Sequence, residues 1–253
     1  MERYQIILAY DGTNFQGFQR QEGDRTVQGE VEDALRRIGW QGRSILSAGR
    51  TDTGVHATGQ VIAVDLEWKH SSDDLLQAMN ANLTEDVAVR MVRVADRGFH
   101  PRFDAISRTY QYRIFHDPIR HPLKERYAWR VSRPVDIDRL HAASRLLVGT
   151  HDFAAFGRPP RQGGSTTRQI FQAGWMVEEG GWRFEVTANA FLYHMVRRIV
   201  HLQVMVGLGQ WSLEKLQAGV ERVEPQMPGL APPQGLTLVE VQYPSDGHEF
   251  EDK

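Results

Sequence analysis

Cysteine is absent from this 253-residue chain. Without thiols the protein can form no disulfide, no thiolate metal site and no iron–sulfur cluster, and it cannot use a cysteine nucleophile. Lysine is scarce as well, because only four of the 30 basic residues are lysines. The others are arginines, which bind phosphate in a bidentate manner and stack on bases. The base composition of the genome would explain this preference for arginine equally well.

Long hydrophobic runs are also absent. No apolar stretch reaches the ~18 residues of a membrane-spanning helix, and the N-terminus lacks the basic and apolar segments of a signal peptide. Hydrophobic residues make up 41% of the chain and charged residues 25%, which is typical of globular proteins. We therefore expect a soluble cytoplasmic protein, without a membrane partner, that has one large domain or two small ones.

The net charge is only −2, which by itself argues against a nucleic-acid partner. The charges are unevenly distributed, however. Residues 90–168 contain 16 basic and 7 acidic residues, whereas acidic residues predominate elsewhere and residues 246–253 form an acidic tail. An arginine-rich middle of this kind is compatible with binding a polyanion such as RNA.

The expected secondary-structure elements occur in the same order twice. In the first half we expect strands at 4–10, 44–48, 60–66 and 87–94, and helices after the caps Thr26 and Ser72. In the second half we expect strands at 108–115, 169–178, 182–188 and 236–243, and helices at 136–148, 191–208 and from 212. This order indicates an α+β fold of two tandem ferredoxin-like β-α-β-β-α-β lobes with mainly antiparallel sheets. We place the lobes at residues 1–104 and 105–245.

The most unusual segment is AGRTDTGVHA at residues 48–57. Gly49 and Gly54 bracket it, as expected where the backbone turns sharply. If residues 50–53 are extended, Arg50 and Asp52 point to the same face, and the guanidinium keeps the carboxylate ionised. An ionised carboxylate on a loop can act as a nucleophile or a base. A structural Arg–Asp pair or an Asx turn would account for the same spacing.

Seven segments along nearly the whole chain carry a family resemblance. They are YDGTNFQGFQ at 10–19, GRTDTGVHA at 49–57, FHPRFDA at 99–105, RTYQY at 108–112, GTHDF at 149–153, ANAFLYHMVR at 188–197 and APPQGL at 231–236. With these segments the chain resembles the tRNA pseudouridine synthase A family. The resemblance implies a two-lobed fold with two sheets joined across a central active-site cleft. This agrees with the repeated element order.

The resemblance also implies roles for single positions. Asp52 matches the catalytic aspartate, which attacks the target nucleotide. Tyr110 matches the tyrosine that packs on the target uracil and is a candidate acceptor for its C5 proton. Arg50 matches the arginine that pairs with the aspartate and holds the site open after the base has left the stack. Members of the family act as homodimers on the tRNA anticodon stem-loop, where they convert the uridines at positions 38, 39 and 40.

The implied reaction requires neither a cofactor nor a metal. Uracil leaves the ribose at N1, turns, and rejoins through C5 without any redox change. The carboxylate can attack C6 of the base or act at C1′ of the sugar, and both routes fit these residues. His194 and His201 are two helical turns apart, ~10 Å, which is too far for one metal ion and indicates packing or RNA-facing roles.

Several arginines are candidates for substrate binding through contacts with the RNA backbone. They are Arg102, Arg108, Arg158, Arg161, Arg168, Arg197 and Arg198. Two alternatives to a tRNA isomerase remain open. One is a non-catalytic RNA-binding or chaperone protein on the same fold, and the other is an enzyme that acts on no RNA and uses Arg50 and Asp52 as an acid–base pair.

Overall fold

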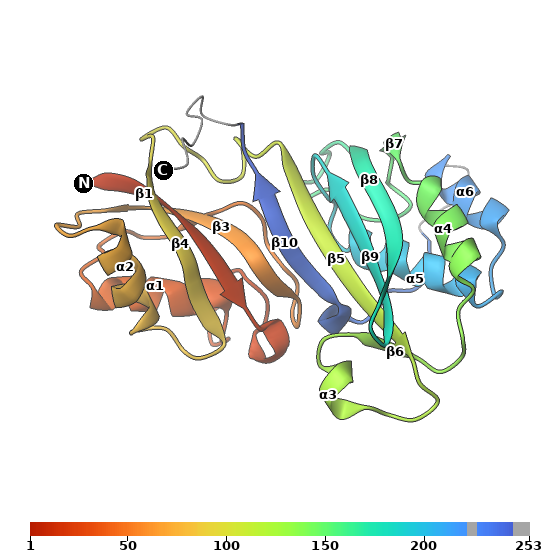
Figure 1. Ribbon diagram of the computed structural model, residues 1–253. Coiled ribbons are helices and arrows are strands. Elements are labelled where there is room, and N and C mark those ends of the chain that lie inside the picture. Colours follow the sequence, from red (N-terminus) through yellow and green to blue (C-terminus); the bar gives the residue numbers. More distant parts are fainter. Residues whose placement is uncertain (222–226, 245–253) are drawn as a thin grey trace, which may run out of the picture.

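A computed structural model describes residues 1–221 and 227–244, so the acidic tail at 246–253 lies outside the described residues. Its strands form one ten-stranded sheet (Figure 1). They are β1 (Glu2–Tyr10), β2 (Leu46–Ser47), β3 (His56–Leu66), β4 (Val87–Ala95), β5 (Ser107–His116), β6 (Trp129–Val131), β7 (Gly149–Asp152), β8 (Thr167–Glu178), β9 (Gly181–Ala188) and β10 (Leu236–Gln242). The helices are α1 (Val27–Arg37), α2 (Ser72–Asn80), α3 (Pro122–Glu125), α4 (Ile137–Arg145), α5 (Met195–Gly207) and α6 (Leu213–Val220), with short 3-10 helices at Gly12–Asn14 and Pro233–Gly235.

The strand order confirms the tandem α+β architecture. Along the sheet it is β4-β1-β3-β10-β5-β9-β8-β7, with β2 also on β3 and β6 also on β5. In each half the last strand lies beside the first, the third follows, and the second comes next, so β4-β1-β3-β2 corresponds to β10-β5-β9-β8. Almost all pairings are antiparallel. The two lobes are fused edge to edge, and their strands form one sheet rather than two.

Strand β10 is the seam between the halves. It is parallel to β3, with Thr237 opposite His56, and antiparallel to β5, with Leu238 opposite Tyr110. At this seam the 3-10 helix before β10 is anchored by Tyr112, whose hydroxyl donates to the carbonyl of Pro232 at 2.7 Å. The last strand in the sequence therefore lies in the middle of the sheet and brings β3 and β5 together.

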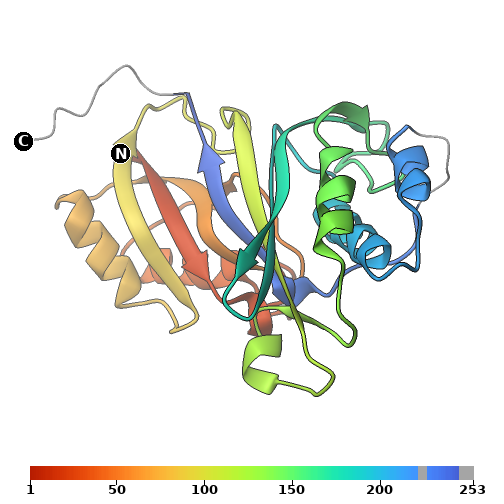
Figure 2. The same ribbon diagram turned by 45° about the vertical axis from the view of Figure 1, so that its right-hand side comes forward.

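The larger helices cover one face of the sheet, as Figures 1 and 2 show. Under α1 and α2 lies one core, which includes Leu35 and Met79, and under α4, α5 and α6 lies a second, which includes Leu140 and Ile199. Tyr110 is packed against both cores. It therefore marks the boundary between the lobes on the helical side of the sheet.

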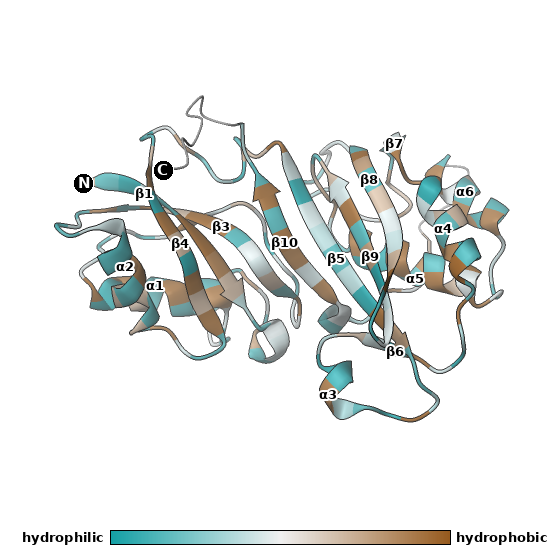
Figure 3. Ribbon diagram, viewed as in Figure 1, coloured by the Kyte–Doolittle hydropathy of each residue, from teal (hydrophilic) through white to brown (hydrophobic). Residues whose placement is uncertain are grey.

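Side chains of β5 alternate between the two faces of the sheet. Tyr112 and Ile114 are buried on the helical side, whereas Gln111 and Thr109 lie on the opposite side among polar groups such as Glu185. Figure 3 shows this alternation as successive hydrophilic and hydrophobic bands along β5 and β10. No described helix covers the polar face of these central strands.

Most of the expected elements are confirmed, and their caps explain their boundaries. The Thr26 side chain accepts from the Gly29 amide at the start of α1, and Ser212 accepts from the Lys215 amide at the start of α6. Helix α2 begins one residue earlier than expected, because Ser71 and Asp74 form a reciprocal capping box.

Three parts of the second half differ from the expectation. Helix α5 begins at Met195 rather than at residue 191, because His194 has a positive φ of 65° that interrupts the helix. Residues 149–152 form the edge strand β7, which was not among the expected elements. The connector between β5 and α4, residues 117–136, holds the short helix α3 and the strand β6, which were not expected either. Among the described helices, none is long and apolar enough to cross a membrane.

Gly59 provides a test of the seam. A Cβ added there would lie 2.1 Å from the carbonyl oxygen of Val239 on β10, so Gly59→Ala must push β10 away from β3. We expect the free energy of unfolding to fall by about 1–3 kcal/mol, as measured by urea denaturation. Gly98→Ala is the matched control, because nothing lies within 4 Å of its added Cβ. Equal stability of the two variants would show that β10 is not tightly held.

Candidate active site

Asp52 lies in a tight turn between β2 and β3. The Val55 amide donates to the Asp52 carbonyl at 3.1 Å, and Gly54 has a φ of 76°, a conformation that favours glycine. The segment is therefore a turn and not the extended strand assumed from the spacing. It leaves the Asp52 side chain 19% exposed, so the carboxylate is shielded but still reachable.

Two side chains of α5 contact the Asp52 carboxylate. Nη1 of Arg197 donates to Oδ2 at 2.9 Å, and Nε2 of His194 lies 3.5 Å from the same oxygen. Nε of Arg197 also donates to the Ala231 carbonyl at 2.9 Å, which fixes the guanidinium on both sides. The first turn of α5 faces the carboxylate, and the positive end of a helix dipole stabilises negative charge there.

Arg50 does not make the ion pair that the spacing suggested. Its side chain is exposed, and within residues 1–221 and 227–244 the cation paired with Asp52 is Arg197. The physical reason is the turn: an alternation of side chains between two faces holds only along an extended backbone. The contribution of Arg50 to the reaction stays a prediction.

The segment of residues 10–18 holds the Asp52 turn from the other side. The hydroxyls of Tyr10 and Thr51 are hydrogen-bonded at 2.8 Å, and the Phe18 amide donates to the Thr51 carbonyl at 3.0 Å. Gly12 approaches the turn so closely that an added Cβ would lie 2.0 Å from the Val55 carbonyl oxygen. These contacts give a structural reason for the first of the seven motif segments.

A polar cluster beside the turn connects the two halves of the chain. Asp11 accepts from Arg126 Nη2 at 2.8 Å and from the Tyr127 hydroxyl at 2.9 Å. Nδ1 of His56 lies 3.2 Å from Asp11, and its Nε2 lies 3.2 Å from the Gln234 carbonyl oxygen. Burial lowers the pKa of His56, so the imidazole is neutral near pH 7. The backbone after Asp52 is thereby tied to the connector and to the segment before β10.

Tyr110 reaches the site from β5. Its ring packs edge to face with Phe191 at 5.1 Å between centroids. Burial raises the pKa of Tyr110, and the nearby Tyr10 and Asp52 raise it further. The phenol is therefore protonated at neutral pH in the free protein. The structure brings Tyr110, Asp52 and Arg197 to one place from three distant parts of the chain.

The arginines expected to bind RNA fall into two groups. Arg102, Arg158 and Arg161 are exposed. The others are engaged with the protein itself: Arg197 with Asp52, Arg198 with the Phe156 carbonyl, Arg168 with the carbonyls of Ser165 and Thr167, and Arg108 with four carbonyls. Of the seven candidates, the exposed three have guanidinium groups that are not already bound to other described residues, and RNA contact by any of the seven stays a prediction.

Arg108 clamps several loops around the site. Its guanidinium donates to the carbonyls of Ala48 at 3.2 Å, Arg102 at 2.6 Å, Ala105 at 3.3 Å and Asn189 at 2.9 Å. Ala48 precedes the Asp52 loop, and Asn189 precedes the segment that leads to α5. A planar guanidinium with five fixed donors can hold these carbonyls together, which the single ammonium of lysine cannot do.

Sequence reasoning missed the contacts of His194 and Arg197 with Asp52. Both residues stand in the motif segment at 188–197, which was a signal that they belong to the site. It did not identify the partner, which is 145 residues from Arg197 in the sequence. Within the described residues, no three His, Asp or Glu side chains are arranged to hold a metal ion.

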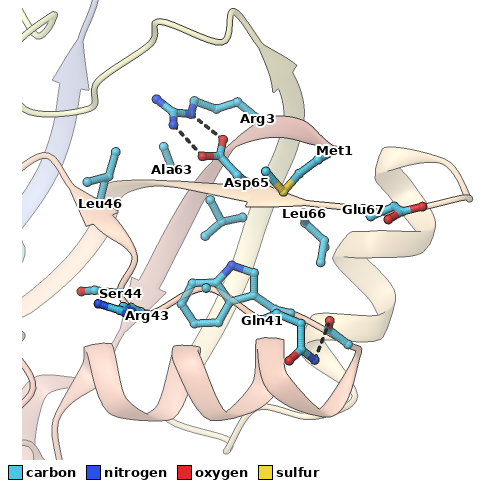
Figure 4. Close-up of a pocket in the computed structure, with 14 residues that line it drawn as sticks. Met1, Arg3, Gln41, Arg43, Ser44, Leu46, Ala63, Asp65, Leu66 and Glu67 are labelled. Atoms are coloured by element: carbon cyan, nitrogen blue, oxygen red, sulfur yellow. Dashed lines mark hydrogen bonds and ion pairs between the residues drawn. The ribbon is translucent and has the colours of Figure 1, made fainter.

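A separate pocket lies in the N-terminal half (Figure 4). Its lining includes Trp40, Leu46 and the ion pair of Arg3 with Asp65, in which Nη2 lies 2.7 Å from Oδ2. None of the predicted site residues lines it. The chemistry-bearing residues are thus gathered at the boundary of the two cores and not in this pocket.

Comparison with known proteins agrees with this arrangement. A family model described as tRNA pseudouridine synthase matches residues 6–104 and 143–244, which include Asp52, Arg197 and the strands β10 and β9 on either side of the strand that carries Tyr110. The chain belongs to the tRNA pseudouridine synthase family. The resemblance of the seven motif segments is thereby confirmed.

Curated relatives match over nearly the full length. A tRNA pseudouridine synthase A of Pseudothermotoga lettingae is 39% identical, over 96% of this chain and all of the relative. One of Methylacidiphilum infernorum is 39% identical, over 96% of both chains. One of Neisseria gonorrhoeae strain FA 1090 is 40% identical, over 96% of this chain and 92% of the relative.

Replacement of Arg108 tests its role as a clamp. Arg108→Lys keeps the positive charge but loses most of the four carbonyl contacts, so we expect a loss of about 1–3 kcal/mol in the free energy of unfolding. Arg133→Lys, at an exposed arginine, is the control and should leave stability unchanged. Chemical denaturation measures both. If Arg108→Lys is as stable as the wild type, the carbonyl contacts do not hold the loops.

Proposed function

We propose that the protein converts uridine to pseudouridine at positions 38, 39 and 40 of the tRNA anticodon stem-loop, with Asp52 as the nucleophile. The observation that carries the proposal is the Asp52 carboxylate, which lies in the family's motif, is partly exposed, and is held 2.9 Å from Arg197. The hydrogen bond from Arg197 fixes the direction of the carboxylate.

The reaction divides into steps that these residues can support. Asp52 attacks the target nucleotide, the N1–C1′ bond breaks, and the uracil turns within the site. The C5–C1′ bond then forms, the proton leaves C5, and N1 gains a proton, so that atoms and charge balance without an oxidant or a reductant. The charge of Arg197 stabilises the carboxylate before attack and again when it is released.

The target base must leave its stack before Asp52 can reach it, at a cost of a few kcal/mol. Stacking on an aromatic ring contributes about 1–3 kcal/mol per base, and the ring of Tyr110 beside Asp52 provides such a stacking surface. Because its phenol is protonated in the free protein, the ring face and a donated hydrogen bond are the contributions that Tyr110 offers at the start of the reaction.

The proposal also assigns roles to exposed arginines. Arg102, Arg158 and Arg161 bind the phosphates of the anticodon stem-loop, and Arg50 holds the site open after the base has left the stack. The protein acts in the cytoplasm as a homodimer and uses no cofactor. Each arginine that contacts a phosphate releases counterions, so RNA binding weakens as the salt concentration rises.

Removal of the Asp52 carboxylate tests the nucleophile. We expect Asp52→Asn to lower pseudouridine formation at least ~1,000-fold, because the amide cannot attack. The measurement is chemical mapping of pseudouridine in unmodified tRNA, and Asp73→Asn on the exposed start of α2 is the control. Full activity of Asp52→Asn would show that Asp52 is not the nucleophile. A wild-type protein that binds tRNA but modifies none of the three positions would favour a non-catalytic RNA-binding protein.

The exposed arginines are tested by salt dependence. Arg158→Gln should weaken tRNA binding and reduce the slope of log K against log salt by about 0.7–0.9, the value for one phosphate contact. Arg145→Gln, which removes an exposed charge at the end of α4, is the control. Binding titrations at several salt concentrations give the slope. An unchanged slope for Arg158→Gln excludes this residue from the RNA contacts.

A further inference from the structure

Tyr193 presents an aromatic ring to solvent close to the catalytic carboxylate. The residue is 58% exposed, and its ring is stacked on the ring of His194 at 3.7 Å between centroids and 27° between planes. Nε2 of His194 in turn lies 3.5 Å from Oδ2 of Asp52. The carboxylate, the imidazole and the phenol ring therefore follow one another outward from the site.

The backbone holds this stack in place. His194 is the one described non-glycine residue with a positive φ, a conformation that costs about 1 kcal/mol and occurs most often at functional sites. The Tyr193 amide donates to the Arg158 carbonyl at 2.9 Å in an isolated β-bridge. On the other side, an added Cβ at Gly157 would lie 2.6 Å from the Tyr193 carbonyl oxygen. The position of Tyr193 is thus determined by close backbone contacts.

Core packing does not account for the ring of Tyr193. It belongs to neither of the two cores, and no described residue forms a hydrogen bond with its hydroxyl. More than half of the residue is exposed, and among the described aromatic pairs the ring stacks on His194. A rigid, exposed aromatic face beside a nucleophile is the kind of surface on which a nucleotide base stacks.

The surrounding charges fit a nucleotide as well. Arg158 is exposed and is paired with Tyr193 through the backbone, while Arg197 and Arg198 follow on the first turn of α5. Arg197 is neutralised by Asp52, and Arg198 donates to the Phe156 carbonyl at 2.7 Å. Arg158 is thus the cation with its guanidinium at the surface, as expected for a phosphate contact next to a stacked base.

We propose that Tyr193 is a stacking site for a base that flanks the target uridine, with Arg158 on the phosphate beside it. The inference rests on the proposed function, because it assumes an RNA substrate whose target base is bound at Asp52. A base on the outer face of Tyr193 is separated from Asp52 by the phenol and imidazole rings. Successive nucleotides of a strand lie about 3.4 Å apart along the helix axis. A nucleotide next to the target uridine can therefore span the separation between Asp52 and the outer face of Tyr193.

The test is a double-mutant cycle between protein and RNA. Binding is measured in the Asp52→Asn background, so that the RNA is not converted, with an anticodon stem-loop that carries an abasic nucleotide on either side of the target uridine. We expect Tyr193→Leu to raise Kd about 10-fold and Tyr193→Phe to leave it within about twofold, since stacking needs the ring and not the hydroxyl. Val177→Ala, at an exposed position on β8, is the control.

The cycle separates stacking from a general effect on the protein. At one flanking position the abasic nucleotide should raise Kd of the Tyr193 form about 10-fold but leave Kd of the Tyr193→Leu form unchanged, because the partner ring is already gone. The proposal is overturned if Tyr193→Leu binds as tightly as Tyr193, or if the two losses multiply at both flanking positions. Pseudouridine formation is mapped separately with proteins that keep Asp52. Absence of pseudouridine there would contradict the proposed function, whereas the binding cycle alone decides on the Tyr193 site.

Discussion

The site depends on the position of β10 between β3 and β5. Neighbouring strands lie ~4.8 Å apart, so this single strand sets a separation of about 10 Å between the strand that follows Asp52 and the strand that carries Tyr110. Without it, the two halves would each keep their own core but would share no sheet. Because β10 is parallel to β3 and antiparallel to β5, its hydrogen bonds also fix the register of both. The joint between the lobes is therefore part of one hydrogen-bonded sheet.

On this frame the Asp52 turn is held mainly by backbone contacts. Gly12 and Gly17 come so close to the turn that an added Cβ would lie 2.0 Å from the Val55 oxygen and 3.0 Å from the Thr51 oxygen. Carbonyl and amide groups have no rotamers to lose, so such contacts position a side chain at a small cost in entropy. Arg197 then fixes the carboxylate itself. The result is a carboxylate that is oriented before any substrate arrives.

Local patterns in the sequence predicted the helices and strands well, but they did not predict contacts between distant segments. Alternation and helical spacing identified the strands and helices, and Thr26 and Ser212 marked helix starts, because these signals involve neighbours within one turn. The interruption at His194 and the pairing of Arg197 with Asp52 depend on the packing of α5 against a loop 145 residues away. The motif segments identified the family, but they did not show that residues 10–18 hold the turn.

Several arginines of the arginine-rich middle segment bind groups of the protein itself. Arg113 is paired with Glu178, Arg126 with Asp11 and Arg130 with Glu125, and the guanidinium groups of Arg108 and Arg168 bind carbonyls of the protein. These side chains therefore also help to build the fold. Twelve of the sixteen basic residues at 90–168 are nevertheless exposed, and one of them, Arg158, is held by a backbone bridge to Tyr193. The net charge of −2 therefore hides a locally cationic segment, and the local charge is what acts on a polyanion close to the surface.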